Sequence, residues 1–97
     1  EESFEKESDP TKIVEDQGAS FVVNEIVILL VDEASLDDAQ LVADLVSGTI
    51  TGFVPNPPTY KIEVAAATTQ EINNFISIIK SSQNPKLIEV TPNFISQ

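Results

Sequence analysis

The sequence predicts an α+β fold, and three observations lead to this prediction. Two segments, beginning at Ser35 and Thr68, repeat apolar residues with the spacing of an amphipathic helix. Four other segments are rich in β-branched residues or alternate apolar with polar residues, as strands do: 25–31, 49–54, 59–64 and 86–91. Along the chain these elements follow the order β-α-β-β-α-β. Two crossovers joined by a hairpin predict a ferredoxin-like sandwich, in which two helices cover one face of a four-stranded antiparallel sheet.

The first strand and the first helix are predicted from local signals. Residues 25–31 form a short apolar run rich in β-branched residues, which favours a strand over a helix. Ser35 is expected to begin the helix, because Asp38 three residues later can complete a capping box. Gly48 is expected to end the helix, since glycine is common just past a helix C-terminus.

A proline-rich loop separates the two middle strands. Residues 49–54 alternate, and residues 55–58 predict a loop because prolines cannot donate to a sheet ladder. Residues 59–64 alternate strictly and are the clearest half-buried strand in the chain. One face of that strand carries Tyr60, Ile62 and Val64, and the other carries Lys61 and Glu63.

The second helix and the last strand complete the pattern. Thr68 and Glu71 predict a capping box at the start of this helix. Its end is expected at Asn84, because the residue before a proline avoids the helical conformation. Residues 86–91 predict the last strand, and Pro92 is expected to end it.

The first 23 residues differ from the rest of the chain. They hold seven acidic side chains against two lysines and show no sustained apolar period, which predicts a disordered leader or linker over residues 1–23. Alternatively, residues 13–14 and 21–23 pack against the domain as a short extra segment. The folded domain is expected over residues 24–97, with a C-terminal tail from about residue 92.

Composition excludes several classes of function. The chain has 97 residues, a formal net charge of -11, and neither histidine nor cysteine. Without these residues it lacks the usual zinc ligands, a thiol nucleophile and an imidazole base, so we expect no metal, no cofactor and no catalytic activity. The negative charge argues against binding to nucleic acid. No apolar run of about 18 residues occurs, so we expect no insertion into a membrane.

The helix-free face of the predicted sheet is the first candidate surface. If alternate residues of the first strand face the helices, then Val27, Leu29 and Val31 point away from them. Three aliphatic residues on an open sheet face suggest a surface for a partner. Alternatively, the leader, a neighbouring domain or a second copy in a homodimer covers this face.

The second half of the chain resembles a known family. Gly48 to Phe53, Tyr60 to Val64, Asn84-Pro85 and Pro92-Asn93-Phe94 follow one another as in the propeptide (inhibitor) domain of subtilisin-like serine proteases. The resemblance covers about residues 24–95. It implies a non-catalytic domain of a secreted precursor, in the extracellular space or cell envelope. Such a domain is an intramolecular chaperone and inhibitor of the protease catalytic domain, which is expected in cis.

The resemblance also implies which residues contact the protease. The tail would lie in the substrate cleft and would comprise Asn93, Phe94, Ile95, Ser96 and Gln97. The open sheet face and the hairpin would dock on the protease through Val27, Leu29, Val31, Phe53, Asn56, Lys61 and Glu63. Family members can place carboxylates near this hairpin to cap helices of the protease, but residues 55–58 contain none and Asn56 offers only an amide oxygen.

Two alternatives to a propeptide in cis follow from the same residues. One is a free-standing protease inhibitor of the same fold. The other is a non-catalytic interaction or dimerisation module of a larger exported protein, which would use the open sheet face for docking. The sequence that follows Gln97 distinguishes the first alternative from a protease precursor, which would continue into a catalytic domain.

Overall fold

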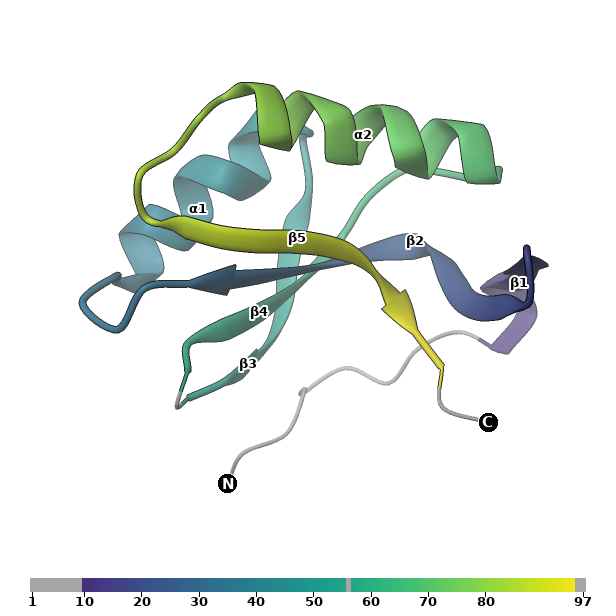
Figure 1. Ribbon diagram of the computed structural model, residues 1–97, viewed down its shortest axis with the longest axis horizontal. Coiled ribbons are helices and arrows are strands. Elements are labelled where there is room, and N and C mark those ends of the chain that lie inside the picture. The colour runs from purple at the N-terminus through teal and green to yellow at the C-terminus, as the bar shows by residue number, and fades with distance from the viewer. Residues whose placement is uncertain (1–9, 56, 96–97) are drawn as a thin grey trace.

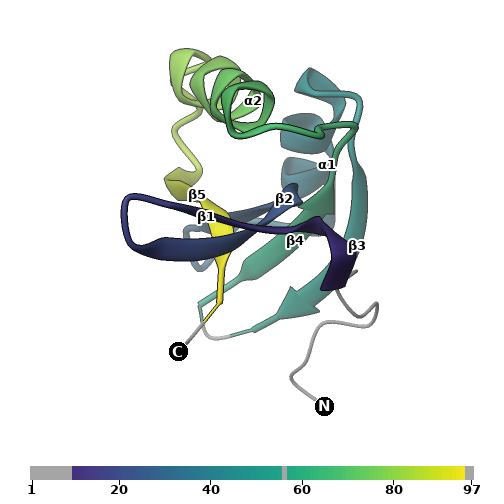
Figure 2. The same cartoon turned by 90° about the vertical axis from the view of Figure 1, so that its right-hand side faces the viewer.

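The computed structural model describes residues 10–55 and 57–95, and it confirms an α+β fold. Five strands form one antiparallel sheet, and both helices lie on the same face of it (Figure 1). The turned view shows the two helices above the sheet and none below it (Figure 2). The elements are η1 (Pro10–Lys12), β1 (Ile13–Asp16), β2 (Ala19–Leu30), α1 (Leu36–Leu45), β3 (Thr49–Val54), β4 (Thr59–Glu63), α2 (Thr69–Ser81) and β5 (Leu87–Phe94).

The long strand β2 organises the sheet. Along one edge it pairs with β5. Along its other edge it pairs first with β1 and then with β4. Strand β3 pairs with β4, so the sheet contains the order β5-β2-β4-β3, with β1 beside the start of β2.

The prediction of a disordered leader is wrong for residues 10–23. A two-residue turn at Gln17 and Gly18, with φ angles of 55° and 85°, joins β1 to β2. Such turns suit hairpins because both residues lie in the left-handed region. Phe21 and Val23 are buried in the core, as the alternative of a packed extra segment anticipated. Residues 1–9 lie outside the described residues.

The core lies between the sheet and the two helices. Ile26, Ile28 and Leu30 alternate along β2, and each is 0% exposed. They meet buried side chains of the helices, including Val42 of α1 and Ile72 of α2. Burial of each such side chain contributes about 1.5–3 kcal/mol, so the face of β2 that carries them packs against the helices. The opposite face of β2 is therefore left for other contacts.

Both helices begin where the capping residues indicated. The backbone N–H of Ser35 donates to Asp38 Oδ2 at 2.9 Å, and Thr68 Oγ1 accepts from the backbone N–H of Glu71 at 3.1 Å. The Glu71 carboxylate accepts from the N–H of Ala67, one residue before the cap, at 2.7 Å. These bonds satisfy amides that have no partner within the helix.

The end of α1 differs from the expectation for Gly48. Ser47, with φ of 53°, takes the left-handed position, and the N–H of Gly48 donates to the carbonyl of Ala43 at 2.8 Å. This is the Schellman pattern with serine in the place that glycine usually holds. Gly48 has a different role, because a Cβ there would lie 2.5 Å from Cγ2 of Ile62.

The last strand continues through Pro92, contrary to expectation. The β2–β5 register shifts between Val22, which pairs with Asn93, and Ile26, which pairs with Pro92. Residues 23–25 therefore bulge out of the β2–β5 ladder. A proline is tolerated at a bulge and on an edge strand, because a ladder hydrogen bond is not needed there. Asn93 and Phe94 thus belong to the sheet and do not begin a free tail.

Candidate docking surface

A groove lies on the helix-free face of the sheet. It has a volume of about 380 Å³ and is lined by Val27, Leu29, Thr59, Glu89, Thr91 and Phe94. Val27 and Leu29 are half-buried, whereas their neighbours Ile26 and Ile28 are fully buried on the helix side. The alternation of β2 therefore places two of the predicted docking residues at this groove.

The third predicted aliphatic residue, Val31, lies just past the end of β2. Its backbone N–H donates to the carbonyl of Lys86 at 3.0 Å. Three groove residues were not anticipated, namely Thr59, Glu89 and Thr91. Thr91 pairs with Val27, and Glu89 pairs with Leu29. The positions of Thr91 and Glu89 therefore depend on the β2–β5 register, which the sequence pattern does not reveal.

A cluster of polar side chains borders the groove at the β2 bulge. Lys61 and Glu25 are 2% and 3% exposed, and Lys61 Nζ lies 3.8 Å from Glu25 Oε2. The Asn93 side-chain amide donates to Glu25 Oε1 at 2.8 Å, and Asn24 Nδ2 donates to Glu63 Oε2 at 3.4 Å. These contacts connect β2, β4 and β5. Because Lys61 is buried in an ion pair with Glu25, its ammonium group links β4 to β2 and is not exposed to solvent.

Phe53, which was expected among the docking residues of the open sheet face and the hairpin, lies on the helix side of the sheet. The β3–β4 register shifts at Thr51, since Ile50 pairs with Ile62 and Gly52 with Lys61. This bulge turns the following residues over, so Phe53 faces the helix side beside Tyr60, with ring centroids 4.8 Å apart. Asn56 lies outside the described residues.

The predicted tail residues are only partly within the described chain. The ring of Phe94 packs edge-on against Phe21, with centroids 6.1 Å apart, while the Phe94 side chain remains 54% exposed. The N–H of Ile95 donates to the carbonyl of Ser20 at 2.8 Å. Pairing with β2 therefore extends to Ile95. Ser96 and Gln97 lie outside the described residues.

Asp38 of α1 forms an ion pair with Lys86. Asp38 Oδ2 lies 3.3 Å from Lys86 Nζ. The hydrogen bond from the Ser35 backbone, with the contribution of Lys86, lowers the pKa of Asp38 below its usual value.

Within residues 10–55 and 57–95, no three potential metal ligands of the carboxylate, histidine or cysteine type come together. No described helix has the length and apolar character needed to cross a membrane.

Comparison of the chain with family models, curated proteins and solved structures gives no match. Its function is therefore inferred from the residues and contacts described above.

Proposed function

We propose that this chain is the propeptide domain of a secreted subtilisin-like serine protease, and that it docks on the catalytic domain through the helix-free face of its sheet. The observation that carries this proposal is the groove beside Val27 and Leu29, which opens on that face next to the C-terminal strand β5. A chain that leaves β5 there can continue from the docked face into a cleft of the same partner.

The strand order supports the same proposal. We infer a ferredoxin-like sandwich with two crossovers, to which the order β5-β2-β4-β3 would correspond if β1 is set aside. On this view β1 is an addition that lengthens the sheet at one end. The two helices cover one face and leave the groove face for the protease, which would bury Val27 and Leu29 on binding.

The mechanism requires no catalytic group in this chain. Apolar burial on the groove face supplies affinity, and the residues that follow Ile95 occupy the substrate cleft as an extended segment. Added main-chain hydrogen bonds in the cleft hold such a segment, and its side chains fill the subsites. The domain acts in cis as a folding assistant and inhibitor, and it requires no cofactor.

Inhibition of a mature subtilisin-like protease by the purified chain tests this function. We expect inhibition in the micromolar range, weakened by about tenfold or more when Leu29→Glu places a charge in the groove. Leu41→Glu is the matched control, because Leu41 is 62% exposed on α1 and lies outside the groove. Circular dichroism establishes that both variants are folded.

Three results would contradict or redirect the proposal. Absence of inhibition up to about 100 μM would contradict it, since that corresponds to a binding free energy weaker than about 5.5 kcal/mol. Equal inhibition by the two glutamate variants would remove the groove face from the interface. Concentration-dependent dimerisation that only Leu29→Glu abolishes, without binding to protease, would support the alternative of a dimerisation module.

A further inference from the structure

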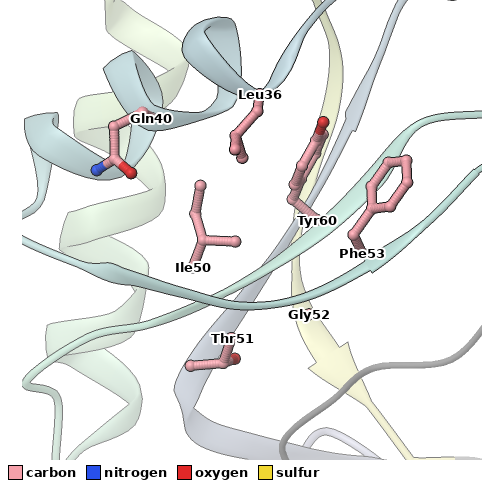
Figure 3. Close-up of a pocket in the computed structure, with 7 residues that line it drawn as sticks. All are labelled: Leu36, Gln40, Ile50, Thr51, Gly52, Phe53 and Tyr60. Carbon is pink, nitrogen blue, oxygen red and sulfur yellow. The ribbon is translucent and has the colours of Figure 1, made fainter.

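A second cavity lies on the helix side of the sheet, between α1 and β3. Its volume is about 480 Å³, and Leu36 and Gln40 of α1 face Ile50 and Phe53 of β3 across it (Figure 3). Tyr60 of β4 lies between Leu36 and Phe53 in the same view. We call this cavity the α1–β3 groove. It is separate from the groove beside Val27, which opens on the opposite face.

The aromatic wall of the α1–β3 groove exists because of the bulge at Thr51. The bulge turns Phe53 toward α1, where its ring remains 40% exposed beside Tyr60. Leu36, on the opposite wall, is 59% exposed. Tyr60 is only 5% exposed and forms the floor between these walls. A large apolar side chain that entered here would cover two exposed apolar walls, Leu36 and Phe53.

The strand beside this groove has an open edge. Within the described sheet β3 pairs only with β4, so its other edge has no strand partner. Natural edge strands are often protected from further pairing by lysine or proline, but residues 49–54 contain neither and carry no charge. An extended peptide can therefore add to β3 and direct alternate side chains toward α1.

The charges on α1 indicate what the peptide would carry. Asp37, Gln40 and Asp44 are spaced as i, i+3 and i+7, so the two carboxylates lie on the same flank as Gln40, which lines the groove. Gln40 Nε2 donates to Asp44 Oδ1 at 2.9 Å. Neither α1 nor β3 contains a lysine or arginine. The rim of the groove is therefore negative and complements a cationic partner.

We propose that the α1–β3 groove binds an extended segment of a partner protein by strand addition to β3. A large apolar side chain of that segment enters between Leu36 and Phe53. Residues two positions before and after it point to the same side, about 13 Å apart, and are lysine or arginine. Asp37 and Asp44 are separated by about 10 Å along the helix, which flexible basic side chains can span. This binding does not depend on the proposed docking to a protease, because it uses the other face of the sheet.

The chain contains its own reporter for this test. Tyr60 is its one tyrosine and it has no tryptophan, so intrinsic fluorescence reports on the groove alone. The probe is the acetylated and amidated peptide Lys-Val-Leu-Val-Lys, titrated into the full chain. We expect a saturable change in fluorescence with a dissociation constant between about 10 μM and 1 mM. Replacing the central leucine by aspartate, or methylating the peptide's backbone nitrogens, is expected to weaken binding by about tenfold or more.

Substitutions in the chain provide the second part of the test. Phe53→Asp and the double variant Asp37→Lys with Asp44→Lys are expected to weaken binding of the basic peptide, whereas Leu41→Asp leaves it unchanged. The double variant alters only exposed residues, so it remains informative if Phe53→Asp does not fold. Each of three results would overturn the proposal. These are the lack of any saturable change in fluorescence, equal binding of the methylated and unmethylated peptides, and equal binding of the basic peptide by the charge-reversed double variant. Self-association through β3 in place of peptide binding would also overturn it, because the occupant would then be a second copy.

Discussion

At the end of α1, Ser47 and Gly48 have two different roles, although a single glycine often has both at a helix end. Ser47 has the left-handed backbone conformation, and Gly48 provides close contact with Ile62 and with the backbone of Glu63. A left-handed residue with a side chain costs about 1 kcal/mol relative to glycine. The close contact at Gly48 leaves no room for a methyl group. The two adjacent positions should therefore respond in opposite directions to substitution.

We expect Ser47→Gly to raise the free energy of unfolding by up to about 1 kcal/mol. We expect Gly48→Ala to lower it by about 1–3 kcal/mol, because the added Cβ would lie 2.5 Å from Ile62 Cγ2 and 3.1 Å from the Glu63 carbonyl oxygen. Urea unfolding followed by circular dichroism measures both. A stabilising Gly48→Ala would show that the contact relaxes without strain.

Tyr60 gives a pH-dependent prediction at the same scale. Burial, with a smaller effect of the Asp38 charge, raises the pKa of Tyr60 above its usual value of 10.0. The unfolded chain then loses the phenolic proton at lower pH than the folded chain. The stability that neutral Tyr60 contributes is complete below pH 10 and is lost as the pH rises through the folded-state pKa.

Tyr60→Phe should therefore flatten the alkaline branch of the stability curve. We expect the melting temperature of the natural chain to fall more steeply than that of the variant above about pH 10. The two chains differ only at this residue, so the difference between their curves reports on Tyr60. Absorbance of the tyrosinate band, which only Tyr60 can contribute, follows the same proton in the folded state. Parallel melting curves for the two chains would contradict the raised pKa.

At the scale of elements, local signals predicted the helices and the middle strands. The starts of α1 and α2 follow from Ser35 and Thr68, and β3 and β4 follow from alternation. Strand β1 and the continuation of β5 past Pro92 were missed for a shared reason. Both depend on pairing with β2, and a bulge decides the β5 register. A single sequence does not contain such long-range information.

The candidate site shows the same limit. Val27 and Leu29 were placed correctly at the groove face because simple alternation holds over that part of β2. Phe53, which the resemblance implied as a docking residue of the open sheet face and the hairpin, lies on the helix side because of the bulge at Thr51. Lys61 lies on a strand whose pattern suggested an exposed face, but its ion pair with Glu25, far away in sequence, leaves it buried.

The hairpin of β1 and β2 leads to a prediction about the domain boundary. A chain that begins at Asn24 lacks β1 and loses the buried side chains of Phe21 and Val23, which are 4% and 2% exposed. Each contributes about 1.5–3 kcal/mol by burial, which is a large part of the stability of a small domain. We expect this chain to be unfolded or to melt well below the full chain. A chain that begins at Pro10 is the control, and equal melting of both truncations would return the boundary to Asn24.

At the scale of the whole molecule, size and charge both limit stability. The chain has 97 residues, no disulfide to support its core, and a net charge of -11. Domains of this size bury a smaller share of their surface than larger ones do, and uniform negative charge adds self-repulsion. A partner that binds only the folded state should therefore have a large effect on the melting temperature.

Binding to a protease should raise the melting temperature of this chain strongly. With protease at about 100 times the dissociation constant, linkage adds about 2.7 kcal/mol to the free energy of unfolding. For a domain of this size, each kcal/mol shifts the melting temperature by about 4–8 °C, so we expect a rise of about 10–20 °C. The measurement is calorimetry with a protease whose catalytic serine is chemically blocked, so that the chain is not digested. Leu29→Glu should lose most of the shift and Leu41→Glu should retain it, because only Leu29 lines the groove on the docking face. An unchanged melting temperature at saturating protease would mean that the folded domain is not the form that the protease binds.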